Sequence, residues 1–232
     1  MKQQHHRIQA ATAIAIILHA VGLVGILAYN SDFIINCTPY NLLVCFALIT
    51  WTQKDKPIAF WLFLLAVFAA GYVVEAIGVN TGKIFGAYKY GTVLGPKILA
   101  TPIMIGINWC IVMYCCGISA YSLLMHLQGG GYKQNLQISK SVKVLSLLVD
   151  GATLATFYDW IMEPVAIQLG FWEWTGDMGV IPWYNYFCWF IISMIMLGIF
   201  HIAPFRKRNK FAINLLLVQL LFFLILRIYL NN

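Results

Sequence analysis

Charged residues are scarce in this chain. Only 10% of its 232 residues are charged, whereas 61% are hydrophobic. A soluble domain carries about 25% charged residues, so this composition excludes an ordinary soluble globular protein. The length suits one bundle of helices better than several domains. We therefore predict an all-α integral membrane protein in which residues 1–232 form a single transmembrane helical domain.

Signals for metal, nucleotide and nucleic-acid chemistry are missing as well. The six cysteines show no C-x-x-C spacing, and the five histidines lack the H-x-x-H-like spacing of a membrane di-iron centre. No Gly-rich phosphate loop follows a strand. We therefore expect no metal and no cofactor, with cysteines acting as small core residues. The net charge of +7 does not indicate nucleic acid, because Lys and Arg of membrane proteins gather on cytoplasmic loops.

Several apolar stretches are long enough to cross a bilayer, which takes about 20 residues. The first is too long for a signal peptide and no A-x-A site follows it, so we expect a retained helix. The second is the weakest, because Asn36, Pro39 and Asn41 interrupt it. The sequence predicts a bundle of about seven transmembrane helices, over 8–28, 33–52, 57–78, 98–124, 142–162, 183–202 and 211–230.

The Lys and Arg residues are distributed unevenly over the two ends of this bundle. All but four of the 15 fall on the side of the N-terminus, the exceptions being Lys83, Lys89, Lys97 and Arg227. This asymmetry predicts a multi-pass protein of a bacterial or archaeal cytoplasmic membrane with a cytoplasmic N-terminus. In either orientation, the loops that follow 57–78 and 142–162 share one face of the membrane.

The few acidic residues are concentrated in these two loops. Six of the eight lie in or beside two stretches rich in glycine and aromatic residues, one from Glu75 to Lys97 and one from Asp159 to Trp174. Carboxyl groups inside or at the edge of a bilayer are functional candidates by default. The candidate catalytic residues are Glu75, Asp159, Glu163 and Asp150.

Asp159 and Glu163 are spaced i, i+4 and therefore occupy one face of a helix. Two poorly solvated carboxyls cannot both ionise cheaply, so one of them is suited to retain a proton and act as a general acid. The helix is expected to end at Pro164. The alternative is that both acids lie at the interface and pair with Lys83, Lys89 or Lys97.

Glu75 is expected at the end of its helix, between Gly71 and Gly78, which permit close approach of other groups. It is alternatively a snorkelling or paired interfacial acid. Lys97 follows Pro96 at the expected start of the next helix, where a cation opposes the helix dipole. We therefore expect Lys97 to have an acidic partner, Glu75 or Glu163, unless it is a solvated interfacial lysine.

Asp150 is predicted to lie deeper in the bilayer, at a depth similar to that of Asn108. Nine residues separate it from Asp159, so a straight helix turns the two to opposite faces. Asp150 is either a structural hydrogen-bond partner of Asn108 or a deeper pocket residue.

Aromatic residues flank the acids in both stretches. They form either an interfacial belt or a wall whose faces stabilise a cation without reacting with it. An acid beside such a wall, with no metal or nucleotide, suits protonation of an alkene. The flanking aromatics are Phe85, Tyr88, Tyr90, Phe171, Trp172, Trp174, Trp183, Tyr184 and Tyr186.

Three motifs together resemble a known family. They are E-x-x-G-V-x-T-G-x-x-F-G-x-Y-x-Y-G-x-x-L-G-P-K from Glu75, P-x-x-I-G-x-N-W from Pro102, and D-x-x-x-E-P-V-A-x-x-x-G-x-W-x-W from Asp159. Across roughly residues 70–190, the chain resembles the carotenoid biosynthesis proteins of the CruF-type carotenoid 1,2-hydratases. Some members have Asp where this chain has Glu163, which keeps the acid but shifts it by one methylene.

The resemblance implies addition of water across the terminal C1=C2 bond of an acyclic carotenoid end group, such as that of lycopene, γ-carotene or bisanhydrobacterioruberin. The partners are then a lipid-soluble carotenoid and water, and association with other enzymes of the pathway is a further expectation. Substrate-binding residues are expected among Phe85, Tyr88, Tyr90, Asn108, Trp109, Trp172 and Trp174, supported by Lys97 and Thr81.

Our mechanistic hypothesis starts with a protonated carboxyl, from the Asp159/Glu163 pair or from Glu75, that gives its proton to C2. A tertiary cation forms at C1 beside the aromatic faces, and a second carboxylate orients water for attack. A carotenoid cyclase would use the same protonation and quench the cation with an internal alkene. A prenyltransferase is disfavoured because paired D-x-x-x-D motifs are missing.

A protein without enzymatic activity is the remaining alternative. A retinal-binding receptor needs a lysine within its last helix, and 211–230 contains none. A transporter more often shows paired repeats with broken helices, which this sequence does not display.

Overall fold

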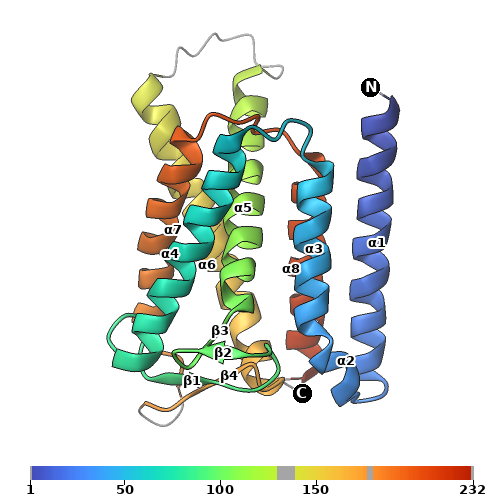
Figure 1. The fold of residues 1–232 in the computed structure, drawn as a ribbon, viewed down its shortest axis with the longest axis vertical. Helices are drawn as coiled ribbons and strands as arrows, with labels where there is room; N and C mark the ends of the chain where they lie inside the picture. The colour runs from blue at the N-terminus through green and yellow to red at the C-terminus, as the bar shows by residue number, and fades with distance from the viewer. Residues whose placement is uncertain (1, 130–138, 177–179, 231–232) are drawn as a thin grey trace.

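The computed structural model describes residues 2–129, 139–176 and 180–230. Long helices run side by side, and short strands cover one end of them (Figure 1). The long helices are α1 (Lys2–Leu27), α3 (Thr38–Thr52), α4 (Ile58–Thr81), α5 (Met104–Gly129), α6 (Lys140–Gln168), α7 (Trp183–Ile202) and α8 (Lys210–Leu230). The short elements are α2 (Asp32–Asn36), β1 (Tyr88–Tyr90), β2 (Lys97–Ile98), β3 (Thr101–Pro102) and β4 (Trp172–Trp174).

The predicted class, an all-α integral membrane protein, is confirmed. In the described part of the chain, six helices have the length and hydropathy of a membrane span. The weak second stretch is indeed interrupted: α2 ends at Asn36, and Pro39 occupies the first turn of the 15-residue helix α3. The 15-residue α3 runs along the bundle beside these six helices, so the described chain starts and finishes at opposite ends of the bundle (Figure 1).

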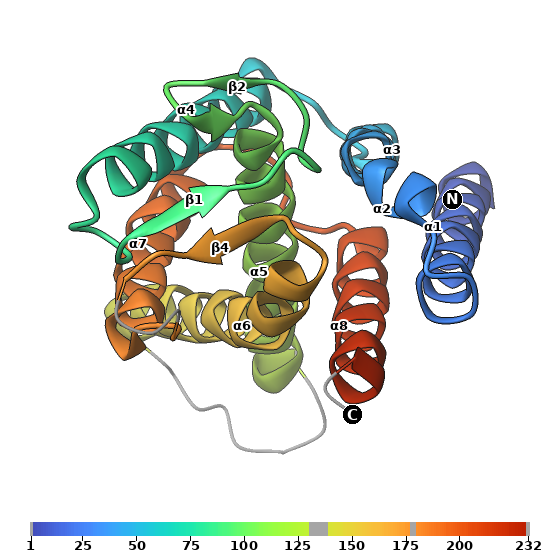
Figure 2. The ribbon, with the colours of Figure 1, turned by 90° about the horizontal axis from the view of Figure 1, so that it is seen from below.

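Helix α5 is the centre of the bundle. Every residue from Asn108 to Ile118 is buried, and α5 contacts α3, α4, α6, α7 and α8. Figure 2 shows it enclosed by these helices. A helix that is apolar on all sides can lie in a protein core or in a membrane, and α5 does so with other helices around it. Cys110, Cys115 and Cys116 of α5 are buried, as predicted for core residues.

Helix α6 continues past Pro164 to Gln168, so the predicted helix end beside this proline was wrong. Proline has no N–H to donate to the carbonyl of residue 160, four positions earlier. Arg227 of α8 supplies the missing donor, because its Nη1 lies 2.6 Å from the Trp160 carbonyl oxygen. Its guanidinium also lies 4.1 Å from the centre of the Trp160 ring. A contact from another helix therefore keeps α6 intact.

The predicted start of the next helix at residue 98 was also wrong. Strands β2 and β3 form a small antiparallel hairpin there, and α5 begins only at Met104. Leu99 and Ala100 have φ angles of 50° and 61°, which lie outside the helical region. Lys97 is consequently not at a helix N-terminus. Its Nζ donates to the Tyr90 carbonyl at 2.5 Å instead of pairing with an acid.

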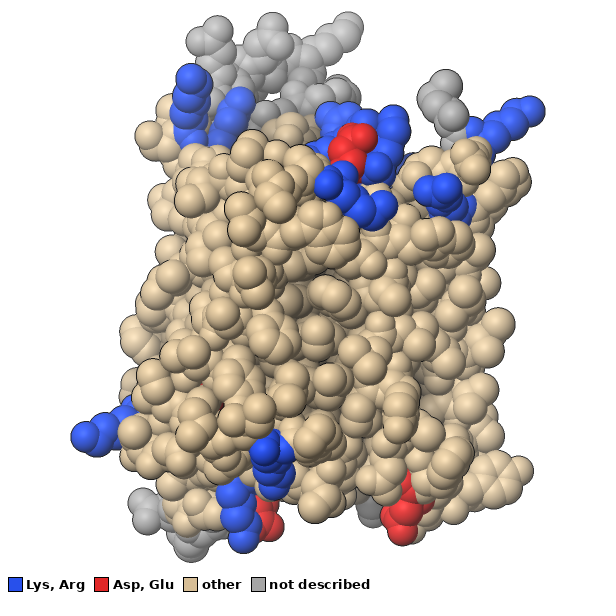
Figure 3. Space-filling model, in the orientation of Figure 1, with Lys and Arg blue, Asp and Glu red and all other residues tan. Residues whose placement is uncertain are grey.

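Charged side chains lie mainly at the two ends of the molecule. On the face shown in Figure 3, Lys and Arg gather at the end where the chain begins, and a broad uncharged belt separates them from the strand-covered end. Lys133, which contributes to the predicted charge asymmetry, lies outside the described residues.

Candidate functional site

Strands β1 and β4 bring together the two loops that contain the acids. They pair antiparallel, with Tyr88 opposite Trp174 and Tyr90 opposite Trp172. Because successive side chains of a strand alternate between faces, these four aromatic residues point inward and are buried. The middle residues, Lys89 and Glu173, point outward and form an exposed ion pair. The prediction that both loops share one face is confirmed.

Glu75 near the end of α4 is buried and held by three donors. The hydroxyls of Tyr88 and Tyr90 donate to its Oε2 at 2.6 and 2.7 Å. Trp109 Nε1 of α5 donates to Oε1 at 3.0 Å. Gly71 makes room for this indole, because a Cβ at Gly71 would lie 2.5 Å from the Trp109 ring.

Glu163 of α6 is held in the same manner by the other strand. The indole nitrogens of Trp172 and Trp174 both donate to its Oε1, at 2.7 and 2.6 Å. Oε2 has no hydrogen-bond partner among the described residues. Each strand therefore supplies two donors to one buried carboxyl, and one carboxylate oxygen of Glu163 stays available.

Asp159 lies one turn before Glu163 and has the fewest partners. Its side chain is 0% exposed. Asn185 Nδ2 of α7 donates to Oδ2 at 3.1 Å, whereas Oδ1 is buried without any partner in the described structure. An unpartnered buried oxygen is costly, so it marks a place where a proton or a ligand is expected.

The tyrosine donors remain protonated. Burial raises the pKa of Tyr88 and Tyr90 above their ordinary value, and the nearby Glu75 charge raises the pKa of both further. Their hydroxyls therefore stay available as donors to Glu75 throughout the neutral and moderately alkaline range.

In the part of the chain that the structure describes, lysine and arginine do not neutralise the buried acids. Within the described residues, the ion pairs are Lys89 with Glu173 and Arg206 with Asp55, and both are exposed. Interfacial pairing of Asp159 and Glu163 with Lys83, Lys89 or Lys97, the alternative raised by the sequence, is not observed. Neutral donors from the strands and neighbouring helices take that place.

Glu75, Asp159 and Glu163 line one small cavity of about 30 Å³. Since about 10–15 Å³ holds one water molecule, the cavity has room for one or two. The remaining lining residues are Phe85, Tyr88, Tyr90, Ile105, Asn108, Met162, Trp172, Trp174, Asn185 and Trp189.

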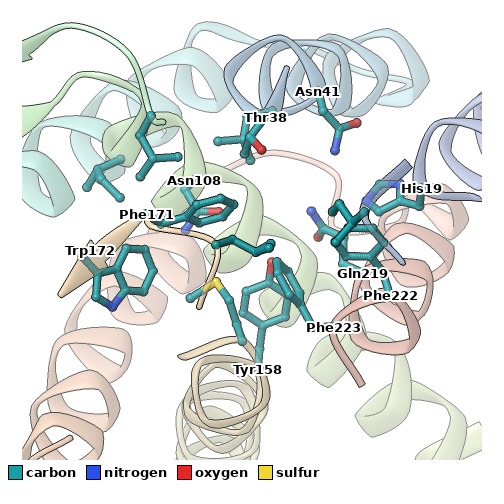
Figure 4. A pocket seen from close by; sticks show the side chains of 16 residues that line it. His19, Thr38, Asn41, Asn108, Tyr158, Phe171, Trp172, Gln219, Phe222 and Phe223 are labelled. Atoms are coloured by element: carbon teal, nitrogen blue, oxygen red, sulfur yellow. The ribbon is translucent and has the colours of Figure 1, made fainter. Parts of the chain in front are cut away.

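A second pocket of about 70 Å³ lies beside the first. Ile105, Asn108, Met162 and Trp172 line both. Figure 4 shows its wall, in which Tyr158, Phe171, Phe222 and Phe223 contribute aromatic rings from several elements. The carboxyl cavity therefore adjoins a mainly apolar pocket formed by α1, α3, α5, α6, α8, β4 and loop residues next to β1 and β4.

The structure brings most of the predicted site residues together, with three exceptions. Asp150 lines neither pocket and accepts from Ser146 Oγ at 2.6 Å, not from Asn108. Lys97 is held by the Tyr90 carbonyl. Thr81 is exposed at the end of α4, where its hydroxyl donates to the Ile77 carbonyl.

Sequence reasoning missed Asn185 and Trp189, both on α7. Asn185 holds Asp159, and the Trp189 ring stacks on that of Trp109 with centroids 4.2 Å apart. A polar Asn in an apolar span was the available signal. It also missed His19 and Gln219, which line the second pocket from α1 and α8.

Fold and site together define a polytopic membrane protein with three carboxyls buried at one end of a helical bundle, next to an apolar pocket. A family model described as "Carotenoid biosynthesis protein" matches residues 38–232. The chain belongs to this carotenoid biosynthesis protein family, and the resemblance seen in its motifs is confirmed.

One curated relative is the bisanhydrobacterioruberin hydratase of Haloarcula japonica. The two are 31% identical over 157 residues, which covers 64% of this chain and 48% of the relative. The chain thus spans about half the length of the curated relative that it matches. No solved structure matches this chain.

Proposed function

We propose that the protein is a carotenoid hydratase that adds water across the terminal C1=C2 bond of an acyclic carotenoid end group. Membership of the carotenoid biosynthesis family and similarity to a hydratase support this reaction class. One observation carries the proposal: Asp159, whose Oδ1 is buried without a partner among the described residues, lines a water-sized cavity together with Glu75 and Glu163.

In our proposal, Asp159 is the acid. Glu75 receives three hydrogen bonds and Glu163 two, all from groups that donate to carboxyl oxygens, and such donors stabilise carboxylate anions. Asp159 receives only one. Three negative charges around one cavity without a cation would repel each other strongly. A proton on Asp159 relieves this repulsion and provides the reagent.

The reaction then proceeds in two steps. Asp159 transfers its proton to C2, the C1=C2 π bond breaks, and a tertiary cation forms at C1. The Glu75 carboxylate and the faces of the flanking aromatics stabilise that cation. Water attacks C1 while the free Oε2 of Glu163 accepts the released proton, which returns to Asp159 one helical turn away. One proton enters and one leaves, so the reaction is redox-neutral.

The positions of the two pockets suit these steps. The apolar pocket takes the isoprenoid chain, and its end reaches the carboxyls past Asn108, which lines both spaces. A cavity with room for one or two waters limits how much solvent meets the cation.

The first experiment is expression in a bacterium engineered to make lycopene or γ-carotene, with pigments analysed by liquid chromatography and mass detection. Glu75→Gln, Asp159→Asn and Glu163→Gln are each expected to lower hydration at least about 100-fold. Asp159→Asn and Glu163→Gln remove a proton-transfer group, and Glu75→Gln removes the negative charge that stabilises the cation. Glu173→Gln is the matched control, because this glutamate lies on β4 but points outward.

The outcomes separate the candidate reactions. Pigments that gain one water with the wild type and the control, and not with the three variants, support the proposal. Products of unchanged mass that absorb at shorter wavelength indicate cyclisation instead. Unchanged pigment from well-expressed protein on both substrates would overturn hydration of the lycopene and γ-carotene end groups, and the same assay in a strain that makes bisanhydrobacterioruberin would then decide the hydratase proposal.

A further inference from the structure

We propose that the apolar pocket contains a second binding site, formed by His19, Asn41 and Gln219, for a hydroxyl group on the substrate chain. This inference rests on the proposed function and adds a specificity site at a distance from the carboxyls. The three residues come from α1, α3 and α8, and Figure 4 shows them at the end of the pocket away from Trp172.

His19 is oriented by its own helix. Its side chain is buried, and Nδ1 lies 2.7 Å from the Ala15 carbonyl oxygen. A carbonyl only accepts, so Nδ1 carries the hydrogen. In the neutral ring, Nε2 is then an acceptor, and no described residue donates to it. The edge-on contact with Phe222 fixes the ring plane.

Gln219 and Asn41 contribute unused amide groups. Gln219 is 3% exposed, yet its side chain has no hydrogen-bond partner in the described part of the chain. Asn41 Oδ1 accepts only a long contact from the Cys45 thiol at 3.8 Å, and its Nδ2 has no described partner. Both amides line the pocket.

Unpartnered polar groups inside a membrane span are costly, because no bulk water satisfies them there. Three such groups on one pocket wall indicate that a ligand satisfies them. Asp, Glu, Lys and Arg are absent from the described lining, so the ligand group is neutral. The remaining wall is mainly apolar, so this group belongs to a largely apolar chain.

A hydroxyl fits this set better than a carbonyl does. It donates one hydrogen, for which His19 Nε2 is the acceptor, and it accepts from an amide of Gln219 or Asn41. A carbonyl would leave the histidine nitrogen without a donor. The substrate class is therefore an acyclic isoprenoid with a hydroxyl some way along the chain from the alkene that reacts.

The test measures the binding of isoprenoid alcohols of increasing chain length. Geraniol, farnesol and geranylgeraniol place a hydroxyl at increasing distance from the same terminal alkene. Each is compared with the hydrocarbon that has CH₃ in place of CH₂OH. Purified protein in micelles is loaded with lycopene, which quenches tryptophan fluorescence, and displacement restores the fluorescence. The assay thus measures binding independently of hydration.

We expect one alcohol of the series to bind about tenfold more tightly than its hydrocarbon, the effect of one well-placed hydrogen bond. In the variants Gln219→Leu and His19→Phe, the alcohol and its hydrocarbon should bind with about equal affinity. Asn214→Leu is the matched control: it also joins α8 to α1, through Thr12 at 3.0 Å, but does not line the pocket. It should keep the preference.

The proposal is overturned if no alcohol is preferred at any length. It is also overturned if Gln219→Leu and His19→Phe weaken alcohol and hydrocarbon equally, because the polar groups would then hold water or pack the helices. If lycopene is bound and hydrated without any alcohol preference, this inference alone fails. Failure to bind lycopene or any chain of the series would remove the proposed substrate class as well.

Discussion

The three buried carboxyls differ most in their supply of hydrogen bonds. Glu75 and Glu163 are each held by two aromatic residues of one strand, and Glu75 also by Trp109. Asp159 has a single donor and one oxygen without a partner. Polar groups that lack hydrogen-bond partners lower the stability of the folded state. Proteins commonly retain such groups because they are needed for function.

This contrast predicts that Asp159→Asn separates stability from activity. The amide has the shape of the carboxyl and carries no charge, so we expect an unchanged or higher melting temperature in detergent. Hydration should nevertheless fall at least about 100-fold. Tyr90→Phe is the contrasting variant, because it removes a donor from buried Glu75 and should cost about 1.5–3 kcal/mol. A drop in melting temperature for Asp159→Asn as large as that of Tyr90→Phe would contradict this view of the residue.

Among the structural elements, the pairing of β1 with β4 decides the site geometry. Each strand is only three residues long, so its pairing depends on close approach of the adjoining loops. Gly91 follows β1 and donates its N–H to the Phe171 carbonyl at 2.9 Å. The exposed Lys89–Glu173 ion pair contributes little to the stability of this strand pairing, because surface ion pairs typically stabilise a protein by only about 0–1 kcal/mol.

Gly91→Ala is therefore expected to disrupt the site without touching a carboxyl. A Cβ at Gly91 would lie 2.0 Å from the Gly170 carbonyl oxygen, so the strands must separate, at a cost of about 1–3 kcal/mol. We expect a lower melting temperature and loss of hydration in the pigment assay. Gly176→Ala is the control, because a Cβ there meets only Ala87 at 3.8 Å. Full activity of Gly91→Ala would show that strand pairing is dispensable.

For the whole molecule, the ends of the described chain lie on opposite sides of the bundle. The excess of Lys and Arg at the N-terminal end leads us to propose a cytoplasmic N-terminus. The strands and the carboxyl cavity would then lie towards the external face.

Terminal reporters test this topology. A fluorescent protein fused to the N-terminus should fluoresce in the cytoplasm, and alkaline phosphatase fused to the C-terminus should be active outside. Both fusions reporting the same side would contradict an odd number of crossings. Reversal of both would contradict only the orientation, because parity and charge asymmetry are independent arguments.

Much of the protein follows from sequence because the bilayer imposes strong rules. Span length and hydropathy predicted every long helix of the described chain, although α1 begins at Lys2 instead of residue 8, α3 begins only at Thr38, and the boundaries of α5 and α6 were wrong as well. Helical spacing placed Asp159 and Glu163 on one face, and span parity placed Glu75 beside them. These inferences need only local geometry, which the chain encodes residue by residue.

Only the tertiary structure decided what depends on contacts between distant segments. Arg227 of α8 donates to the carbonyl that Pro164 leaves without a donor, and α6 continues past this proline. Lys97 lies in the hairpin of β2 and β3 and not at the start of a helix. The register of β1 against β4 assigns tyrosines to Glu75 and tryptophans to Glu163. Neither pairing has a periodic signal, because a three-residue strand is too short to display one. The sequence by itself therefore determined the class, the spans and the carboxyl cluster, whereas long-range packing decided which donor serves which acid.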